Sequence, residues 1–301
     1  MQNITKSLLS LSLLLPLMAC DDDSSETETQ SLVDVATDNG NFTILLGALE
    51  STGLDITLGG DTDYTVFAPT DDAFRRLPAG VLESLDAATL EKILTYHVVP
   101  GSVPASTVIT LNSATTAEGA DVAIQIVDGG VIINGTTQVT TTDVLADNGV
   151  IHVLDSVLLP PDIAFPGDIV DAALAYPIFD TLAGAVVAAE LAETLKTDNE
   201  GAGFTIFAPQ NSAFAELDID LSDLSTEELS NVLLYHAVGD TVEAAAVVGL
   251  SSAPTLQGTE VTIQVSDAGV TLNETANVVR VDLRTSNGVI HVIDEVLLPT
   301  I

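Results

Sequence analysis

Residues 65–74 read T-V-F-A-P-T-D-D-A-F, and residues 205–214 repeat this stretch as T-I-F-A-P-Q-N-S-A-F. A second stretch, N-G-V-I-H-V-L-D at residues 148–155, returns as N-G-V-I-H-V-I-D at residues 287–294. Between them a Tyr-His pair occurs at residues 96–97 and again at 235–236. Repeat units of solenoid proteins are about 20–50 residues long, far shorter than the spacing here. The sequence therefore predicts a duplicated domain.

The three motifs, in this order and spacing, resemble the fasciclin (FAS1) domain. The first and last stretches are similar to the two signature boxes of that family, and the resemblance extends over residues 31–301. It implies an α+β fold with two tandem fasciclin-like domains, each a β-sandwich or wedge with helices packed along one side. It also implies a non-enzymatic adhesion or matrix-interaction module, because fasciclin domains are usually secreted or membrane-anchored and rarely enzymes.

The order of local patterns in each repeat agrees with an α+β domain, because helical patterns come first and strand patterns last. The clearest amphipathic helix is predicted over residues 86–97, with its counterpart over 225–236. We place domain 1 at residues 31–161 and domain 2 at residues 166–301. The junction between them is short and contains three prolines, so we expect it to be partly stiff.

Several details of these elements can be predicted from single residues. Thr70 is expected to cap the short helix after the first motif, and Asn211 is expected to do so in the second copy. Ser225 and Glu228 form the pattern of a capping box. The strands that begin at Gly149 and Gly288 are apolar on both faces, which indicates that they are central and covered.

The charge balance excludes some classes of partner. The chain has 7 Lys and Arg against 44 Asp and Glu, a net charge of −37. Nucleic-acid binding depends on basic side chains that replace counterions, so we expect no nucleic-acid partner. An acidic surface favours solubility and suits a salty environment, and specific attraction of Ca²⁺ or of basic partners is the alternative.

The N-terminus has the pattern of a targeting signal. Residues 1–19 combine Lys6 with a short apolar stretch and are predicted to be a lipoprotein signal peptide. The run Leu17-Met18-Ala19-Cys20 resembles a bacterial lipobox, which implies cleavage before Cys20 and a diacylglycerol on its sulfur. An ordinary secretory signal is the alternative. Residues 20–30 are polar and acidic and are predicted to be a disordered tether.

This pattern predicts a cell-envelope protein that is lipid-anchored outside the cytoplasm and bound to the membrane through its N-terminal lipid. The outer membrane or the cell surface is favoured, and the periplasmic face of the inner membrane is the alternative. The single cysteine leaves no intramolecular disulfide and no cysteine-based zinc site.

The four histidines form two pairs with equal spacing, His97 with His152 and His236 with His291. Two histidines do not complete a zinc site, so we expect structural roles inside the fold, no metal and no cofactor. The signatures of nucleotide binding and of hydrolases are absent from the sequence, which predicts no enzymatic activity. A solvated loop is the favoured interpretation of Asp61 and Asp63, with Ca²⁺ ligation as the alternative.

The candidate partner-binding residues follow from the resemblance. Tyr96, His97, Tyr235 and His236 match the Tyr-His motif of the family, and packing inside the fold is the competing interpretation. Asp143 and Asp282 precede the last box, at a position that the resemblance connects with adhesion. The expected partner is a protein or a polysaccharide of the cell surface or matrix. The alternative function is a periplasmic ligand-binding or complex-assembly factor, and the oligomeric state stays open.

Overall fold

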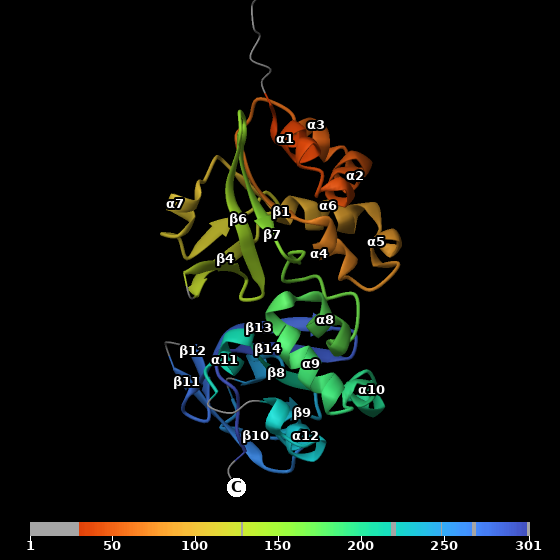
Figure 1. Ribbon diagram of the computed structural model, residues 1–301, viewed down its shortest axis with the longest axis vertical. Coiled ribbons are helices and arrows are strands. Elements are labelled where there is room, and N and C mark those ends of the chain that lie inside the picture. Colours follow the sequence, from red (N-terminus) through yellow and green to blue (C-terminus); the bar gives the residue numbers. More distant parts are fainter. Residues whose placement is uncertain (1–29, 128, 218–220, 248, 267–268, 300–301) are drawn as a thin grey trace, which may run out of the picture.

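The computed structural model describes residues 30–299, apart from residues 128, 218–220, 248 and 267–268. The predicted signal peptide and Cys20 lie outside the described residues. The described chain forms two domains stacked along the long axis of the molecule, and α1 lies at the end of domain 1 that is remote from domain 2 (Figure 1).

Both domains have the same order of elements, with helices first and most strands last. Domain 1 contains α1 (Leu32–Asn39), α2 (Thr43–Thr52), α3 (Leu54–Leu58), β1 (Tyr64–Pro69), α4 (Asp71–Arg75), α5 (Val81–Ser84), α6 (Ala87–Tyr96), β2 (Val98–Pro100), α7 (Ala105–Val108), β3 (Ser113–Thr115), β4 (Asp121–Val127), β5 (Gly130–Ile133), β6 (Thr137–Ala146) and β7 (Gly149–Leu154).

Domain 2 contains α8 (Ile169–Ala175), η1 (Pro177–Phe179), α9 (Asp180–Ala188), α10 (Ala192–Leu195), η2 (Asn199–Gly201), β8 (Phe204–Pro209), α11 (Asn211–Ala215), η3 (Leu221–Asp223), α12 (Thr226–Tyr235), β9 (Ala237–Val238), α13 (Ala244–Val247), β10 (Ser252–Pro254), β11 (Glu260–Ser266), β12 (Gly269–Leu272), β13 (Ala276–Thr285) and β14 (Gly288–Ile293).

Each domain has one seven-stranded mixed sheet, with the order β2-β1-β7-β6-β5-β4-β3 in domain 1 and β9-β8-β14-β13-β12-β11-β10 in domain 2. The strands of the two sequence motifs, β1 and β7, pair in parallel, and Val66 lies opposite Ile151. The other strand pairs are antiparallel. All six residues of β7 are buried, which confirms the prediction of a central, covered strand.

The sheet has apolar side chains on both faces, and they form different cores. On one face, Ile93 of α6 and Leu45 of α2 pack with Ile151 of β7 in a cluster that continues into domain 2. On the other, Phe67, Ile133 and neighbouring strand residues form a second cluster that belongs to domain 1 alone. Domain 2 has an equivalent second cluster. The α+β class, with helices along one side of the strands, is thereby confirmed.

Local capping signals have mixed outcomes. Thr70 caps α4 by accepting a hydrogen bond from the Ala73 amide, and Ser225 and Glu228 form the expected capping box of α12. The prediction for Asn211 is wrong, because residue 210 is the N-cap of α11 and makes no side-chain capping bond. Asn211 instead accepts a hydrogen bond from the Thr181 amide and donates one to the carbonyl of Pro177.

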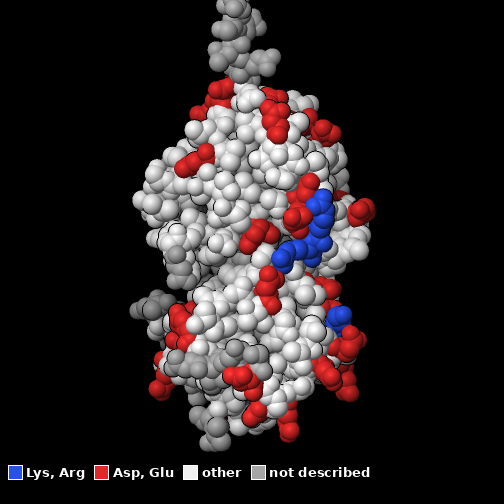
Figure 2. Space-filling view, in the orientation of Figure 1, with Lys and Arg blue, Asp and Glu red and all other residues white. Residues whose placement is uncertain are grey.

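Most of the Lys and Arg residues that the structure describes lie near the junction between the domains (Figure 2). Arg76 of domain 1 bonds to Asp180 and to the carbonyl of Leu174 in domain 2. Arg284 of domain 2 donates to the Pro161 carbonyl in the connecting segment. Further contacts come from Arg280, which donates to Thr136, and from Lys92, which pairs with Asp162. Of the six Lys and Arg that the structure describes, four therefore hold the junction together.

Candidate partner-binding site

The Tyr-His motif of domain 1 lies inside the fold, where α6 ends. The hydroxyl of Tyr96 donates to the Asp121 carbonyl at 3.0 Å and accepts from Nδ2 of Asn134 at 2.9 Å. Nδ1 of His97 lies 2.7 Å from the carbonyl of Ile93, and Nε2 accepts a hydrogen bond from the Leu158 amide at 3.0 Å. Both side chains are 2% exposed. The motif joins α6 to the segment that follows β7.

The motif of domain 2 repeats this arrangement. Nδ1 of His236 lies 2.9 Å from the Val232 carbonyl, and Nε2 accepts from the Leu297 amide at 2.8 Å. Burial lowers the pKa of both His97 and His236 to about 4, so both imidazoles are neutral at neutral pH. In the described chain these histidines face backbone groups, and their side chains present no surface to a partner.

The candidate residues Asp143 and Asp282 occupy a different position, at irregularities of the long strand β6 and its counterpart β13. Asp143 has φ +57° and accepts a hydrogen bond from the Ala105 amide at the start of α7. Its own amide points to Nδ1 of His152, at 3.4 Å. Asp282 makes the same contacts with Ala244 and His291. Each aspartate thus fixes a short helix against the sheet.

The structure does not join these candidates into one site. Tyr96 and His97 belong to a buried network around α6, while Asp143 belongs to the network of His152. Of the candidates in domain 1, only Asp143 is exposed. Burial also lowers the pKa of His291, whose Nε2 lies 2.9 Å from the Val242 carbonyl. Among the described residues, no group of three or more His, Cys, Asp or Glu is placed to hold a metal ion.

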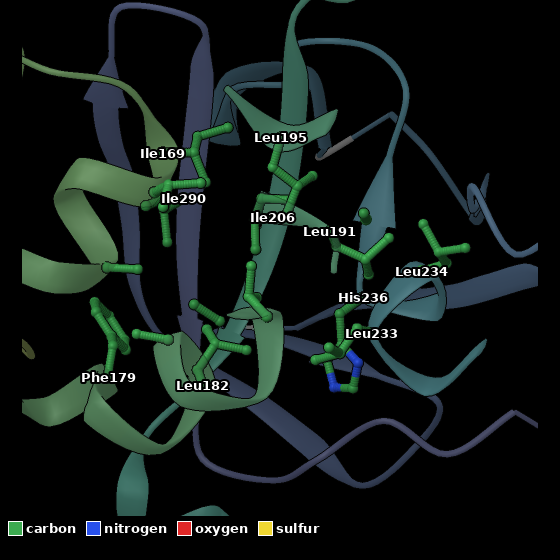
Figure 3. Close-up of a pocket in the computed structure, with 16 residues that line it drawn as sticks. Ile169, Phe179, Leu182, Leu191, Leu195, Ile206, Leu233, Leu234, His236 and Ile290 are labelled. Carbon is green, nitrogen blue, oxygen red and sulfur yellow. The ribbon is translucent and has the colours of Figure 1, made fainter. Parts of the chain in front are cut away.

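Two small cavities lie in the interior. One lies between the helices and the sheet of domain 2, and the other lies between α4, α5 and α6 of domain 1 and the segment that follows β7. The cavity of domain 2 has a volume of about 30 Å³ and is lined by apolar residues such as Ile206 and Leu233, together with the imidazole of His236 (Figure 3). The cavity of domain 1 measures about 40 Å³. Pockets that hold small molecules typically measure about 300–1,000 Å³. These two cavities are therefore packing defects rather than ligand pockets.

Sequence reasoning missed two asparagines that recur in both domains. Asn148 accepts from the Leu32 amide and donates to the carbonyls of Leu58 and Gly60, which ties α1 and α3 to the sheet. Asn287 makes the corresponding bonds in domain 2. Their recurrence at equivalent positions of the two repeats was the available signal.

No single helix in the described part of the chain is long and apolar enough to cross a membrane. The helices Ile169–Ala175 and Pro177–Ala188 together have sufficient length and apolar content, but they are bent by 106° relative to each other.

Comparison with known proteins places this geometry in a class. The fasciclin domain family matches residues 40–160 and 177–299, and each range covers most of one structural domain. The chain belongs to the fasciclin family.

Among relatives, it is 45% identical over 135 residues to Protein sll1483 of Synechocystis sp. (strain ATCC 27184 / PCC 6803 / Kazusa), covering 44% of this chain and 74% of that protein. It is 29% identical over 247 residues to the transforming growth factor-beta-induced protein ig-h3 of Sus scrofa, covering 80% of this chain but only 35% of that protein. A solved FAS1 domain pair from the insect cell adhesion molecule fasciclin I matches 88% of this chain and 95% of its own, with 19% identity and a TM-score of 0.48.

Proposed function

We propose that this protein is a non-enzymatic adhesion or matrix-interaction module of the cell envelope, lipid-anchored through Cys20. The observation that carries the proposal is the pair of fasciclin domains joined end to end through a packed, ion-paired junction. In such a pair the binding surfaces of the two domains keep a fixed distance and orientation. This arrangement favours the binding of a repetitive or extended partner.

The position of the first helix supports presentation away from a membrane. α1 lies at the end of domain 1 that is remote from domain 2 (Figure 1). The acidic tether, residues 20–30, leads directly into this end. An anchor on Cys20 would therefore leave domain 2 outermost, facing a partner on another surface.

The buried histidines argue for a binding role rather than a catalytic one. A general base needs a pKa near the working pH and a free nitrogen that can reach a substrate. His97 and His236 have pKa values of about 4, and both of their nitrogens are already engaged with backbone groups.

Metabolic labelling with a radioactive fatty acid tests the anchor. We expect label on the protein, a shift in its mobility after signal-peptide processing, and loss of both in the Cys20→Ser variant. An unlabelled wild-type protein that is released into the medium would overturn the lipid anchor, and would leave secretion without an anchor as the remaining form of the proposal.

A further inference from the structure

The two domains have equivalent surfaces near their Tyr-His motifs, and among the described residues only the surface of domain 1 is covered. In domain 1 it is formed by Asn134, Gly135 and Thr136, next to Tyr96. The domain 2 counterparts are Asn273, Glu274, Thr275 and Tyr235. The local geometry is conserved between them, since the Asn-to-Tyr hydrogen bond is 2.9 Å in both domains and φ is +68° at Gly135 and +67° at Glu274.

The surface of domain 1 holds an arginine that domain 2 supplies. Nη1 of Arg280 donates to the hydroxyl of Thr136. A Cβ at Gly135 would lie 2.9 Å from the Cβ of Arg280, so the arginine packs directly on the glycine. Gln210 adds a bond to the Gly135 carbonyl at 3.2 Å. Within the described chain, Arg280 forms no ion pair with a carboxylate.

The equivalent surface of domain 2 is an open groove of about 610 Å³ with an acidic lining. Glu216, Glu260, Glu274 and Glu295 line it, beside Tyr235 and Thr275. Three of these acids are particular to domain 2, because Arg76, Gly135 and Ser156 stand at the equivalent positions of domain 1. The groove thus keeps a threonine at the position of Thr136, which accepts from Arg280 on domain 1, and adds negative charge around it.

A second copy of this chain does not supply the missing cation. Domain 1 of a second molecule could dock on this groove in the way that domain 2 docks on domain 1 within the chain. The residue of that domain 1 equivalent to Arg280 is Thr141. A threonine offers no charge to the four glutamates, and the net charge of −37 on each molecule opposes the contact. The occupant must therefore bring its own basic group.

We propose that the groove of domain 2, defined by Glu216, Tyr235, Glu274 and Thr275, binds an arginine-bearing segment of a partner protein. The guanidinium reaches the Thr275 hydroxyl and the glutamates along a different path from that of Arg280, because Glu274 has a Cβ where Gly135 leaves room for the Arg280 Cβ. Its several N–H groups serve the threonine hydroxyl and the glutamates together. The arginine site gives the proposed adhesion function a partner of defined chemistry. It rests on that function only for its role in the cell.

The test is an NMR titration of the ¹⁵N-labelled full chain with the peptide acetyl-Val-Val-Arg-Val-amide, which copies residues 278–281. A matched peptide with Gln in place of Arg is the first control. We expect saturable shifts confined to the groove, at the amides of residues such as Tyr235, Asn273 and Thr275, and binding of the Gln peptide weaker by about fivefold or more. The Glu216→Gln/Glu274→Gln variant should bind the Arg peptide more weakly by a similar factor. The control variant Glu50→Gln, at an exposed position of α2 in domain 1, should bind it as the wild type does.

Three outcomes would overturn the proposal: no saturable shifts, equal binding of the two peptides, or shifts spread over acidic positions of both domains. The last would show general charge attraction. The binding result is separate from the cellular role, because a protein found away from the cell surface would contradict adhesion and leave a measured arginine site intact.

Discussion

At the scale of single residues, the histidine of each Tyr-His motif connects two distant parts of the backbone. Each imidazole of the Tyr-His motif bridges a helix carbonyl and a backbone amide that lies 61 residues further on. A buried amide that loses its acceptor costs about 1–3 kcal/mol, so such a bridge is difficult to replace. The motif therefore recurs because both domains need the same connection between α6 or α12 and the end of the sheet.

We predict that His97→Leu lowers the free energy of unfolding by about 1–3 kcal/mol at pH 7.5, because the Leu158 amide loses its acceptor. Urea unfolding monitored by circular dichroism measures the change. Glu50→Gln, at an exposed position, is the control and should leave the midpoint unchanged within error.

The same variant has a defined pH dependence. The pKa of His97 falls from 6.5 to about 4 on folding, so the unfolded chain takes up a proton first as the pH falls. The stability that the neutral imidazole provides is complete above about pH 6.5 and is lost as the pH falls towards 4. His97→Leu removes this loss. The free energy of unfolding of the wild type should therefore fall by about 2 kcal/mol relative to that of the variant between pH 7.5 and pH 5. A difference that stays constant would show that His97 titrates normally in the folded protein.

At the scale of elements, each domain has one parallel pair of strands, β1 with β7 in domain 1 and β8 with β14 in domain 2. Gly149 begins β7 opposite Tyr64, with φ +146°. A Cβ at this position would lie 1.9 Å from the Tyr64 carbonyl oxygen. The strands can meet in this register only because residue 149 is glycine, and Gly288 has the same role beside Phe204.

We predict that Gly149→Ala lowers the free energy of unfolding by about 3 kcal/mol or more, since the backbone of a central strand must move. Gly101→Ala is the matched control, because Gly101 also has a positive φ, +89°, but nothing lies within 4 Å of its Cβ position. Gly101→Ala should lower the free energy of unfolding by only about 1 kcal/mol. Equal effects of the two substitutions in urea unfolding would contradict the steric account of the register.

Gly47→Ala should have the opposite sign. Gly47 lies in the exposed face of α2, with nothing within 4 Å of its Cβ position. Alanine in a helix interior is favoured over glycine by about 0.5–1 kcal/mol, and we expect a gain of this size in the same urea experiment. A loss of stability would contradict the view that Gly47 is an unconstrained position of α2.

The elements also show which features a sequence can predict. The capping box at Ser225 and the face of α6 that ends in His97 were predicted correctly, because each depends on residues within a few positions of one another. The prediction that Asn211 caps α11 was wrong because its side chain bonds to Thr181 and Pro177, which are 30 and 34 positions away in the sequence. The contact between Arg280 and Thr136 spans 144 residues and had no local signal.

At the scale of the whole molecule, the uneven distribution of charge determines how the domains are held. Acidic side chains are scattered over both domains, while most described cations bond across or into the junction (Figure 2). Phe165 and Tyr176, with ring centres 5.9 Å apart, add apolar packing beside these bonds. The junction is thus a fixed interface rather than a free hinge.

We predict that the double variant Arg76→Gln/Arg280→Gln loosens the two domains. The loss of one exposed ion pair and of one partly buried hydrogen bond should lower the coupling between the domains by about 1–2 kcal/mol. Small-angle X-ray scattering should show a larger radius of gyration, and calorimetry should separate two unfolding transitions. Arg75→Gln is the control, because Arg75 pairs only within its own helix. An unchanged scattering curve for the double variant would show that the apolar contacts and the remaining bonds, such as that of Arg284 with Pro161, are sufficient.

The central claim is that the domain pair is displayed outside the cell, and protease shaving of intact producing cells tests it most directly. Immunoblotting against the protein follows brief protease treatment, with a cytoplasmic protein as the control for lysis. The account predicts that the protein is lost while the control survives. Survival of the protein until the outer membrane is permeabilised would contradict surface adhesion and would favour a periplasmic binding or assembly role.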